Sequence, residues 1–265
     1  MVARACQVMP ASHPNVVLRF FFLFYTQWLS RHDHISPVYI TASLQPRSRI
    51  PGLPDSWGSQ REECRDDLLP VINPAYPYVN DARNVGRCGL EVFYAELTSA
   101  HRLLSNAETP LEQIWKPYRI WEDYATFLVV HVSCEEETEE KAEVALAAWS
   151  SYVMSKLRML IYAVERLVDA RPYPRKVNDA SLRGGTHSNR CLKGSCFLIG
   201  ISDRKGSRLV RKNTFSEAFD ELRYAVLEGC TAKKGGRGFE RDERTMHEPW
   251  FALVAAADLP SILGT

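Results

Sequence analysis

The sequence has no strong charge of either sign. Its 265 residues carry 33 Lys and Arg against 32 Asp and Glu, which gives a formal net charge of +1. A chain this neutral has no molecule-wide field that would attract it to nucleic acid or to an anionic membrane. Any such attraction must come from local clusters of charge.

The chain also lacks a long apolar run. Its most apolar stretch, VVLRFFFLFYTQWL at residues 16–29, is shorter than the roughly 20 residues that span a bilayer, and it contains Arg19 and Gln27. It lies too far from a basic start, and lacks a small-residue cleavage site, to be a secretory signal. Because apolar residues lie all round it, we expect an interior helix here, no membrane contact and a soluble, intracellular protein.

Closely spaced metal ligands and phosphate loops are missing as well. The seven cysteines are odd in number and scattered, which indicates free thiols in a reducing compartment. Cys191 and Cys196 have no second pair to complete a zinc shell, and the His-Asp-His run at 32–34 is too local to converge on one ion. Neither GGTHS at 184–188 nor KKGGRG at 233–238 has the Gly-Lys-Ser or Gly-Lys-Thr of a phosphate loop. We predict no metal site.

The sequence does contain enough apolar residues for a sizeable core. The composition is 45% hydrophobic, which suits one large or two modest domains. Up to residue 120 the chain predicts helices joined by proline-rich turns, with one helix entered at Pro14 and another over about 85–104. Near Trp121 the pattern changes to aromatic and β-branched runs, so we predict a domain over 1–120 and a second over 121–265.

The second half alternates strand and helix patterns. A Ser133/Glu136 capping box and the acidic run 135–140 predict the start of a long helix whose apolar stripe ends at Val164. A second helix is predicted over 215–227, and strands over 124–132, 166–173, 195–201 and 250–256. This order is the β-α-β-β-α-β arrangement of ferredoxin-like and RNA-recognition-like folds. The expected fold class is therefore α+β, with a helical domain followed by a ferredoxin-like one.

Basic residues are concentrated in this second half. Between residues 165 and 237 there are sixteen Lys or Arg against eight Asp or Glu. Loops beside the strand SCFLIGI, residues 195–201, are placed to neutralise RNA phosphates. The alternative is that they are ordinary solvated loops. Because SCFLIGI offers Phe197 as its single aromatic residue, we expect backbone contact rather than base stacking. The predicted RNA-binding residues are Arg204, Lys205, Arg208, Arg211, Lys212, Lys233 and Lys234.

A stiff polar corner interrupts the first half. The stretch LLPVINPAYPYVNDARNVG, residues 68–86, holds three prolines and three asparagines. Proline fixes φ and pushes the preceding residue toward extended conformations, so a rigid, non-helical corner is expected. Within it, PVINPAYPYVNDARNV is similar to the ITPAYP-type segment of eukaryotic poly(A) polymerases. MVARACQVMP and VVLRFFFLFYTQW also resemble the helical central domain of that family. The resemblance continues more weakly into the family's carboxy-terminal RNA-binding domain.

The resemblance implies nuclear addition of adenylate from ATP to RNA 3′ ends during mRNA polyadenylation, with cleavage and polyadenylation factors as further partners. The family holds Mg or Mn ions on the carboxylates of an Asp-x-Asp pair, which follows a Gly-Ser pair on an amino-terminal nucleotidyltransferase domain. This chain contains no Asp-x-Asp, and Gly58-Ser59 leads into acidic residues on a proline-rich connection. We therefore predict no catalytic residue, no cofactor bound by this chain alone and no activity in isolation. The resemblance of VARACQ places Met1 just after the family's ATP-contacting stretch, so we expect that the start is truncated. Such a truncation would expose core surface and lead to self-association.

The corner itself is implied to line the nucleotide cleft near the adenine. The candidates for contact are Tyr76, Asn80 and Asn84, which can donate and accept hydrogen bonds. Asp81 and Ala82 stand where the family has Ser-Thr, so a hydroxyl contact to adenine is not carried over. The alternative is that Asn80 and Asn84 cap the turn and the helix. The alternative for the whole chain is a non-catalytic RNA-binding or scaffold protein derived from a poly(A) polymerase.

Overall fold

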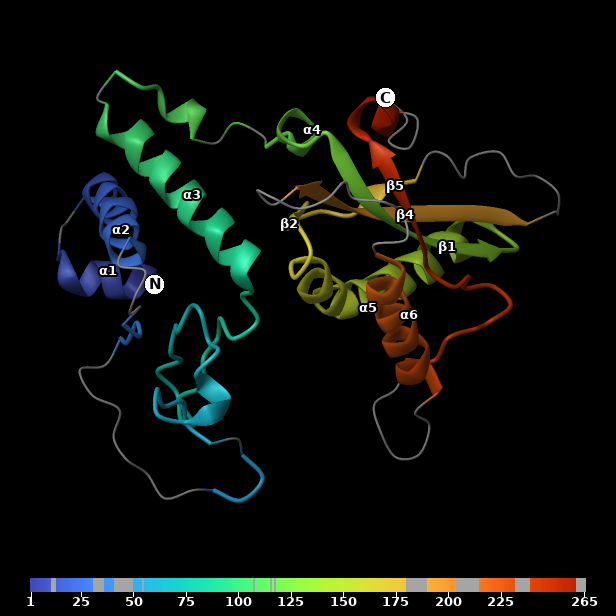
Figure 1. The fold of residues 1–265 in the computed structure, drawn as a ribbon, viewed down its shortest axis with the longest axis horizontal. Helices are drawn as coiled ribbons and strands as arrows, with labels where there is room; N and C mark the ends of the chain where they lie inside the picture. Colours follow the sequence, from blue (N-terminus) through green and yellow to red (C-terminus); the bar gives the residue numbers. More distant parts are fainter. Residues whose placement is uncertain are drawn as a thin grey trace. The chain divides into compact units, whose positions relative to one another are not determined.

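The chain divides into two compact units, residues 1–117 and residues 118–265, both drawn in Figure 1. The computed structural model describes residues 1–10, 13–30, 36–40, 50–53, 55–106, 108–114, 116, 118–179, 190–203, 215–231 and 239–260.

The first unit is helical, as expected. It contains α1 (Val2–Val8), α2 (Pro14–Leu29) and α3 (Arg87–Ser105), with short 3₁₀ turns η1 (Glu62–Cys64) and η2 (Leu111–Gln113). Helix α2 begins at Pro14, whose fixed φ suits a first helical position. It packs against both α1 and α3. The predicted start of α3 is two residues too early, because Gly86 is the N-cap.

The core of this unit lies between the three helices. Ala5, Tyr25, Leu29 and Leu97 are buried together, and the Tyr25 hydroxyl donates to the carbonyl oxygen of Met1 at 2.8 Å. Burial raises the pKa of Tyr25 to about 12, so the phenol stays protonated. The expectation that all of α2 is interior is wrong for its first turn, where Val16 is 46% exposed. Helix α2 is therefore covered mainly on its last turns.

The second unit is a mixed helix and strand domain. The strands are β1 (Thr126–Glu136), β2 (Asp169–Pro172), β3 (Val177–Asn178), β4 (Cys191–Ser202) and β5 (Trp250–Ala255). The helices are α4 (Ile120–Asp123), α5 (Glu139–Val164) and α6 (Ser216–Thr231), and the 3₁₀ turn η5 (Ala256–Asp258) follows β5. The four strands and the two helices predicted for this half are all present.

Every pairing between these strands is antiparallel. The strand order is β2-β4-β1-β5, and the two-residue β3 also pairs with β4. In this order the first and third long strands are the central pair, which is the ferredoxin-like arrangement. The α+β fold class is thus confirmed. In Figure 1 both α5 and α6 cover the same face of the sheet.

The two faces of the sheet differ in what covers them. Val130 lies opposite both Phe197 on β4 and Phe251 on β5, and Phe251 contacts Phe219 of α6 at 4.4 Å between ring centroids. Side chains alternate along a strand, so Val130 and Phe197 face the helices. Phe127 and Val129, by contrast, pack with other buried residues against Tyr118, Tyr124 and their neighbours. Ile120 of the short helix α4 also packs there. We call this second side, which neither α5 nor α6 covers, the helix-free face.

The predicted capping box at Ser133 and Glu136 is wrong. Strand β1 continues through both residues because it pairs with β4 as far as Cys191. The N-cap of α5 is Thr138, whose hydroxyl accepts from the Lys141 N–H at 3.3 Å. The acidic run is thus divided between the end of β1 and the first turn of α5. In that first turn its carboxylates interact favourably with the positive end of the helix dipole.

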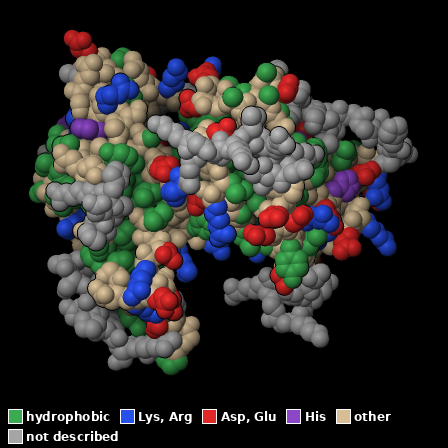
Figure 2. Space-filling view, viewed as in Figure 1, with side chains coloured by type: hydrophobic (Ala, Val, Ile, Leu, Met, Phe, Trp, Pro, Cys, Tyr) green, Lys and Arg blue, Asp and Glu red, His purple; other side chains and the backbone are tan. Residues whose placement is uncertain are grey.

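None of the helices in the described ranges is long and apolar enough to cross a membrane. Figure 2 shows acidic and basic side chains interspersed over the face in view, in keeping with the balanced composition.

Candidate nucleotide corner and nucleic-acid surface

The proline-rich corner forms a small hairpin. Asn73 N–H donates to the Val79 carbonyl at 2.9 Å, and Asp81 N–H donates to the Val71 carbonyl at 2.9 Å. At the tip, Tyr78 N–H donates to the Ala75 carbonyl at 2.9 Å. These backbone bonds hold the corner as a defined, non-helical shape, as the prolines predict.

Asn80 fastens the two arms of this hairpin to each other. It is 5% exposed, and its Oδ1 accepts from the N–H of Val71 and from the N–H of Ala82, both at 2.9 Å. Its Nδ2 is buried and has no partner among the residues that the structure describes. The side-chain oxygen of Asn80 therefore forms its hydrogen bonds within the corner, as expected if this residue caps the turn.

The other two cleft candidates lie nearer the surface. Tyr76 is half-buried, and its ring meets that of Tyr78 edge-on at 5.6 Å between centroids. Asn84 is exposed, two residues before the N-cap of α3. The corner thus presents one aromatic ring and one amide outward, while Asn80 supports them from within.

A pocket of about 130 Å³ lies beside the corner and includes Asn80 in its lining. Arg61 bridges Asp55 at 2.9 Å and Glu63 at 2.8 Å there, and the Trp57 Nε1 donates to Asp67 at 2.9 Å. Three carboxylates outnumber the guanidinium groups that line this pocket. Such a lining repels phosphate, so the triphosphate of a nucleotide does not suit it.

On the helix-free face of the second unit, a histidine and a tryptophan are stacked. The rings of His131 on β1 and Trp250 on β5 are 3.7 Å apart between centroids and 4° from parallel. The His131 Nδ1 hydrogen-bonds to the carboxylate of Asp179, and both side chains are buried. Burial first, and then the Asp179 charge, raise the pKa of Cys196 to about 12, so this neighbouring thiol stays protonated.

A second histidine follows along the same face. His247 N–H donates to the Ser133 carbonyl at 3.0 Å, and the Ser133 hydroxyl lies 3.1 Å from His247 Nδ1. On its other side, His247 Nε2 lies 3.8 Å from Glu135. Neither His247 nor Trp250 was predicted from the sequence, because planar side chains were expected on the central strand β4. Phe197, the aromatic residue found there, faces the helices instead.

The seven basic residues predicted to bind RNA lie outside the described residues, since they fall at 204–214 and 232–238. Their assignment stays a prediction.

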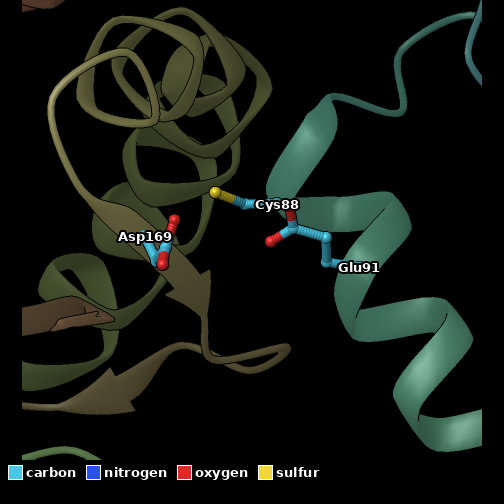
Figure 3. Close-up of side chains that lie close together, drawn as sticks. All are labelled: Cys88, Glu91 and Asp169. Carbon is cyan, nitrogen blue, oxygen red and sulfur yellow. The ribbon is translucent and has the colours of Figure 1, made fainter. Parts of the chain in front are cut away.

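Three further side chains, labelled in Figure 3, have donor atoms of the kinds that bind metals. Cys88 and Glu91 belong to α3 in the first unit, whereas Asp169 begins β2 in the second. The Arg87 guanidinium already contacts Cys88 Sγ at 3.2 Å and Glu91 at 2.8 Å. The positively charged Arg87 guanidinium, which contacts both Cys88 and Glu91, repels a metal ion. We therefore assign no metal site to these residues.

Comparison with known proteins identifies relatives over most of the chain. Residues 1–122 match the family model described as "Poly(A) polymerase central domain". Over 85% of its length the chain is 28% identical to "Nuclear poly(A) polymerase 2" of Arabidopsis thaliana, and over 78% it is 27% identical to "Nuclear poly(A) polymerase 4" of the same plant. It is also 27% identical, over 76% of its length, to "Poly(A) polymerase" of Dictyostelium discoideum.

The chain spans about a quarter of the length of each of these relatives, with values of 27%, 26% and 24%. The similarity extends beyond the central domain into the ferredoxin-like unit, because 85% of the chain exceeds what residues 1–122 alone supply. Residues 1–122 thus match a poly(A) polymerase central domain, and the chain is similar over most of its length to eukaryotic poly(A) polymerases.

Proposed function

We propose that this chain supplies RNA binding and one wall of the nucleotide cleft in a nuclear poly(A) polymerase, which adds adenylate from ATP to RNA 3′ ends. The observation that carries the proposal is the succession of a poly(A) polymerase central domain and a ferredoxin-like unit within one related chain. Cleavage and polyadenylation factors are the protein partners that this role implies.

In the cleft wall, the three corner residues have different tasks. Tyr76 and Asn84 are the groups that contact the nucleotide, because the structure leaves them half-buried and exposed. Asn80 is a positioning residue, since its Oδ1 is bonded to two backbone N–H groups of the corner. A corner fastened in this way presents its contacts without a further loss of conformational freedom on binding.

RNA binding is assigned to the second unit. The excess of basic residues between 165 and 237 attracts phosphates, and release of their counterions makes such binding fall steeply with salt. The predicted contacts are with the backbone, which suits an enzyme that meets transcripts of many sequences.

Metal ions and ATP belong to the proposed full reaction. Mg or Mn, when bound, would supply activation of the attacking 3′ hydroxyl and neutralisation of phosphate charge. The Asp-x-Asp pair that would hold such ions does not occur in this chain. We therefore propose that the ions and the triphosphate are held by a nucleotidyltransferase domain, and that this chain alone does not transfer adenylate.

The RNA assignment is tested by titrating the purified chain with a fluorescent oligoadenylate at several salt concentrations. One variant carries Arg204, Lys205, Arg208, Arg211 and Lys212 changed to Ala. A matched control loses the same charge from the first unit, through changes of Arg4, Arg65, Arg83, Arg102 and Lys116 to Ala. We expect a steep salt dependence that flattens in the first variant and persists in the control. Equal slopes in all three proteins would exclude the assigned loop.

A second candidate function is a non-catalytic RNA-binding or scaffold protein, favoured by the lack of any Asp-x-Asp in the chain. The genomic sequence upstream of Met1 separates the two functions. An in-frame Gly-Ser and Asp-x-Asp segment supports the polymerase, whereas a stop codon with a promoter supports the scaffold.

A further inference from the structure

We propose that Trp250 and His247 form a stacking platform for the bases of single-stranded RNA on the helix-free face of the second unit. The proposal rests on the RNA-binding function proposed above and adds the side chains that would contact bases.

The Trp250 ring is held in one orientation. One of its faces lies flat on the His131 imidazole, at 3.7 Å and 4°, and that imidazole is in turn bonded to the buried Asp179. Trp250 nevertheless stays 45% exposed. A partly exposed ring that is held against a buried partner loses little conformational freedom when a planar group stacks on it. The buried His131–Asp179 pair thus supports the exposed indole.

His247 extends this surface along the same edge of the sheet. His131 and Ser133 are two residues apart on β1, so their side chains lie on the same face. Trp250 pairs with His131, and His247 bonds to Ser133 through both its N–H and its ring. The two planar side chains therefore follow each other beside β1. The His247 side chain is 40% exposed, which leaves part of its ring open to a ligand.

The chemistry of this surface favours a nucleobase. Every base has a π-face, and stacking on aromatic side chains is a sequence-tolerant way to hold single strands. In the sequence, residues 165–237 carry an excess of basic residues, the composition expected of a unit that binds RNA. The nearby carboxylate of Glu248 is bonded to the Arg223 guanidinium at 3.0 Å, so its repulsion of a strand is partly offset. The carboxylate of Glu135 lies 3.8 Å from His247. RNA-recognition folds also use the helix-free face of the sheet for stacking, although on their central strands.

The test measures the affinity of the whole chain for a fluorescent oligoadenylate in Trp250→Ala, Trp250→Phe and His247→Ala. Trp121→Ala is the matched control, because Trp121 is another tryptophan of this unit with 39% exposure. We expect Trp250→Ala to weaken binding by about five- to a hundredfold, the usual loss for one stacked base. His247→Ala should weaken binding less, while Trp250→Phe and Trp121→Ala should bind as the wild type does. The slope of affinity against salt should stay unchanged in Trp250→Ala, because no phosphate contact is removed.

Equal affinity of wild type, Trp250→Ala and His247→Ala would overturn the platform. If the basic-loop variant still flattens the salt slope in that case, RNA binding stands and the stacking role alone fails. A wild-type chain that binds no oligoadenylate would remove the proposed function as well. Circular dichroism checks that each variant is folded. Should Trp250→Ala be unfolded, His247→Ala decides. Quenching of tryptophan fluorescence by oligoadenylate that persists in Trp121→Phe but is lost in Trp250→Phe would then also support the platform.

Discussion

Removal of the Asn80 side chain tests whether this one residue holds the proline-rich corner. In Asn80→Ala, the N–H groups of Val71 and Ala82 both lose their acceptor. Asn80 is 5% exposed, so bulk water does not readily replace it. A buried donor left without a partner costs about 1–3 kcal/mol, so two such donors should cost about 2–6 kcal/mol of folding free energy. For a unit of this size, that corresponds to a fall in melting temperature of roughly 10–30 °C.

Asn73→Ala is the matched control for this change. Asn73 also supports the corner, since its Oδ1 accepts from the Ala75 N–H at 2.8 Å and its Nδ2 donates to Asp81. These bonds are exposed, so water replaces them and we expect a loss of about 0.5–1.5 kcal/mol.

The assay combines denaturant unfolding with hydrogen exchange. Unfolding gives the free-energy difference between the variants, and exchange reports separately on the amides of Val71 and Ala82. Both amides should exchange much faster in Asn80→Ala than in the wild type. If Asn80→Ala is no less stable than Asn73→Ala and the two amides stay protected, Asn80 does not hold the corner and our reasoning fails.

Two further outcomes are expected in the second unit. In Gly200→Ala, the new Cβ would lie 2.6 Å from Cγ of the Tyr124 ring, so we expect a loss of about 1–3 kcal/mol, measured by denaturant unfolding; wild-type stability would contradict the packing of that ring on the glycine. Alkylation at pH 8 should modify the exposed Cys6 within minutes and spare Cys134 and Cys196, because burial raises the pKa of each of these two thiols to about 12. Their labelling should rise only when denaturant unfolds the sheet, and mass spectrometry of the labelled peptides would reveal any earlier reaction.

Helices and strands could be predicted from periodicity, but their ends could not. The apolar stripe of α5 includes Leu146, Trp149 and Val164, all of them buried. The predicted start of that helix is wrong. Ser133 and Glu136 form a local capping pattern in the sequence, but pairing with β4 extends β1 through both residues. Pairing with a distant strand thus outweighed the local capping pattern. The residues of β1 alone do not indicate that β4 is the strand with which they pair.

The corner could be recognised from its prolines, whereas the stacked rings could not. Tyr76 and Asn84 lie in one short motif, so sequence order alone brings them together. His131, Asp179 and Trp250 are far apart along the chain, and only the strand register makes them neighbours. In addition, Trp250 stands on an edge strand, where an exposed aromatic residue is indistinguishable in sequence from a buried one.

The residues that contact RNA can be mapped directly. Ultraviolet crosslinking of the purified protein to oligoadenylate, followed by mass spectrometry of the crosslinked peptides, identifies the residues in contact. Our account predicts crosslinks in peptides that contain residues 204–212, residues 233–234 and Trp250. Crosslinks confined to residues 1–117, or none at concentrations that saturate binding, would contradict the assignment of RNA binding to the second unit.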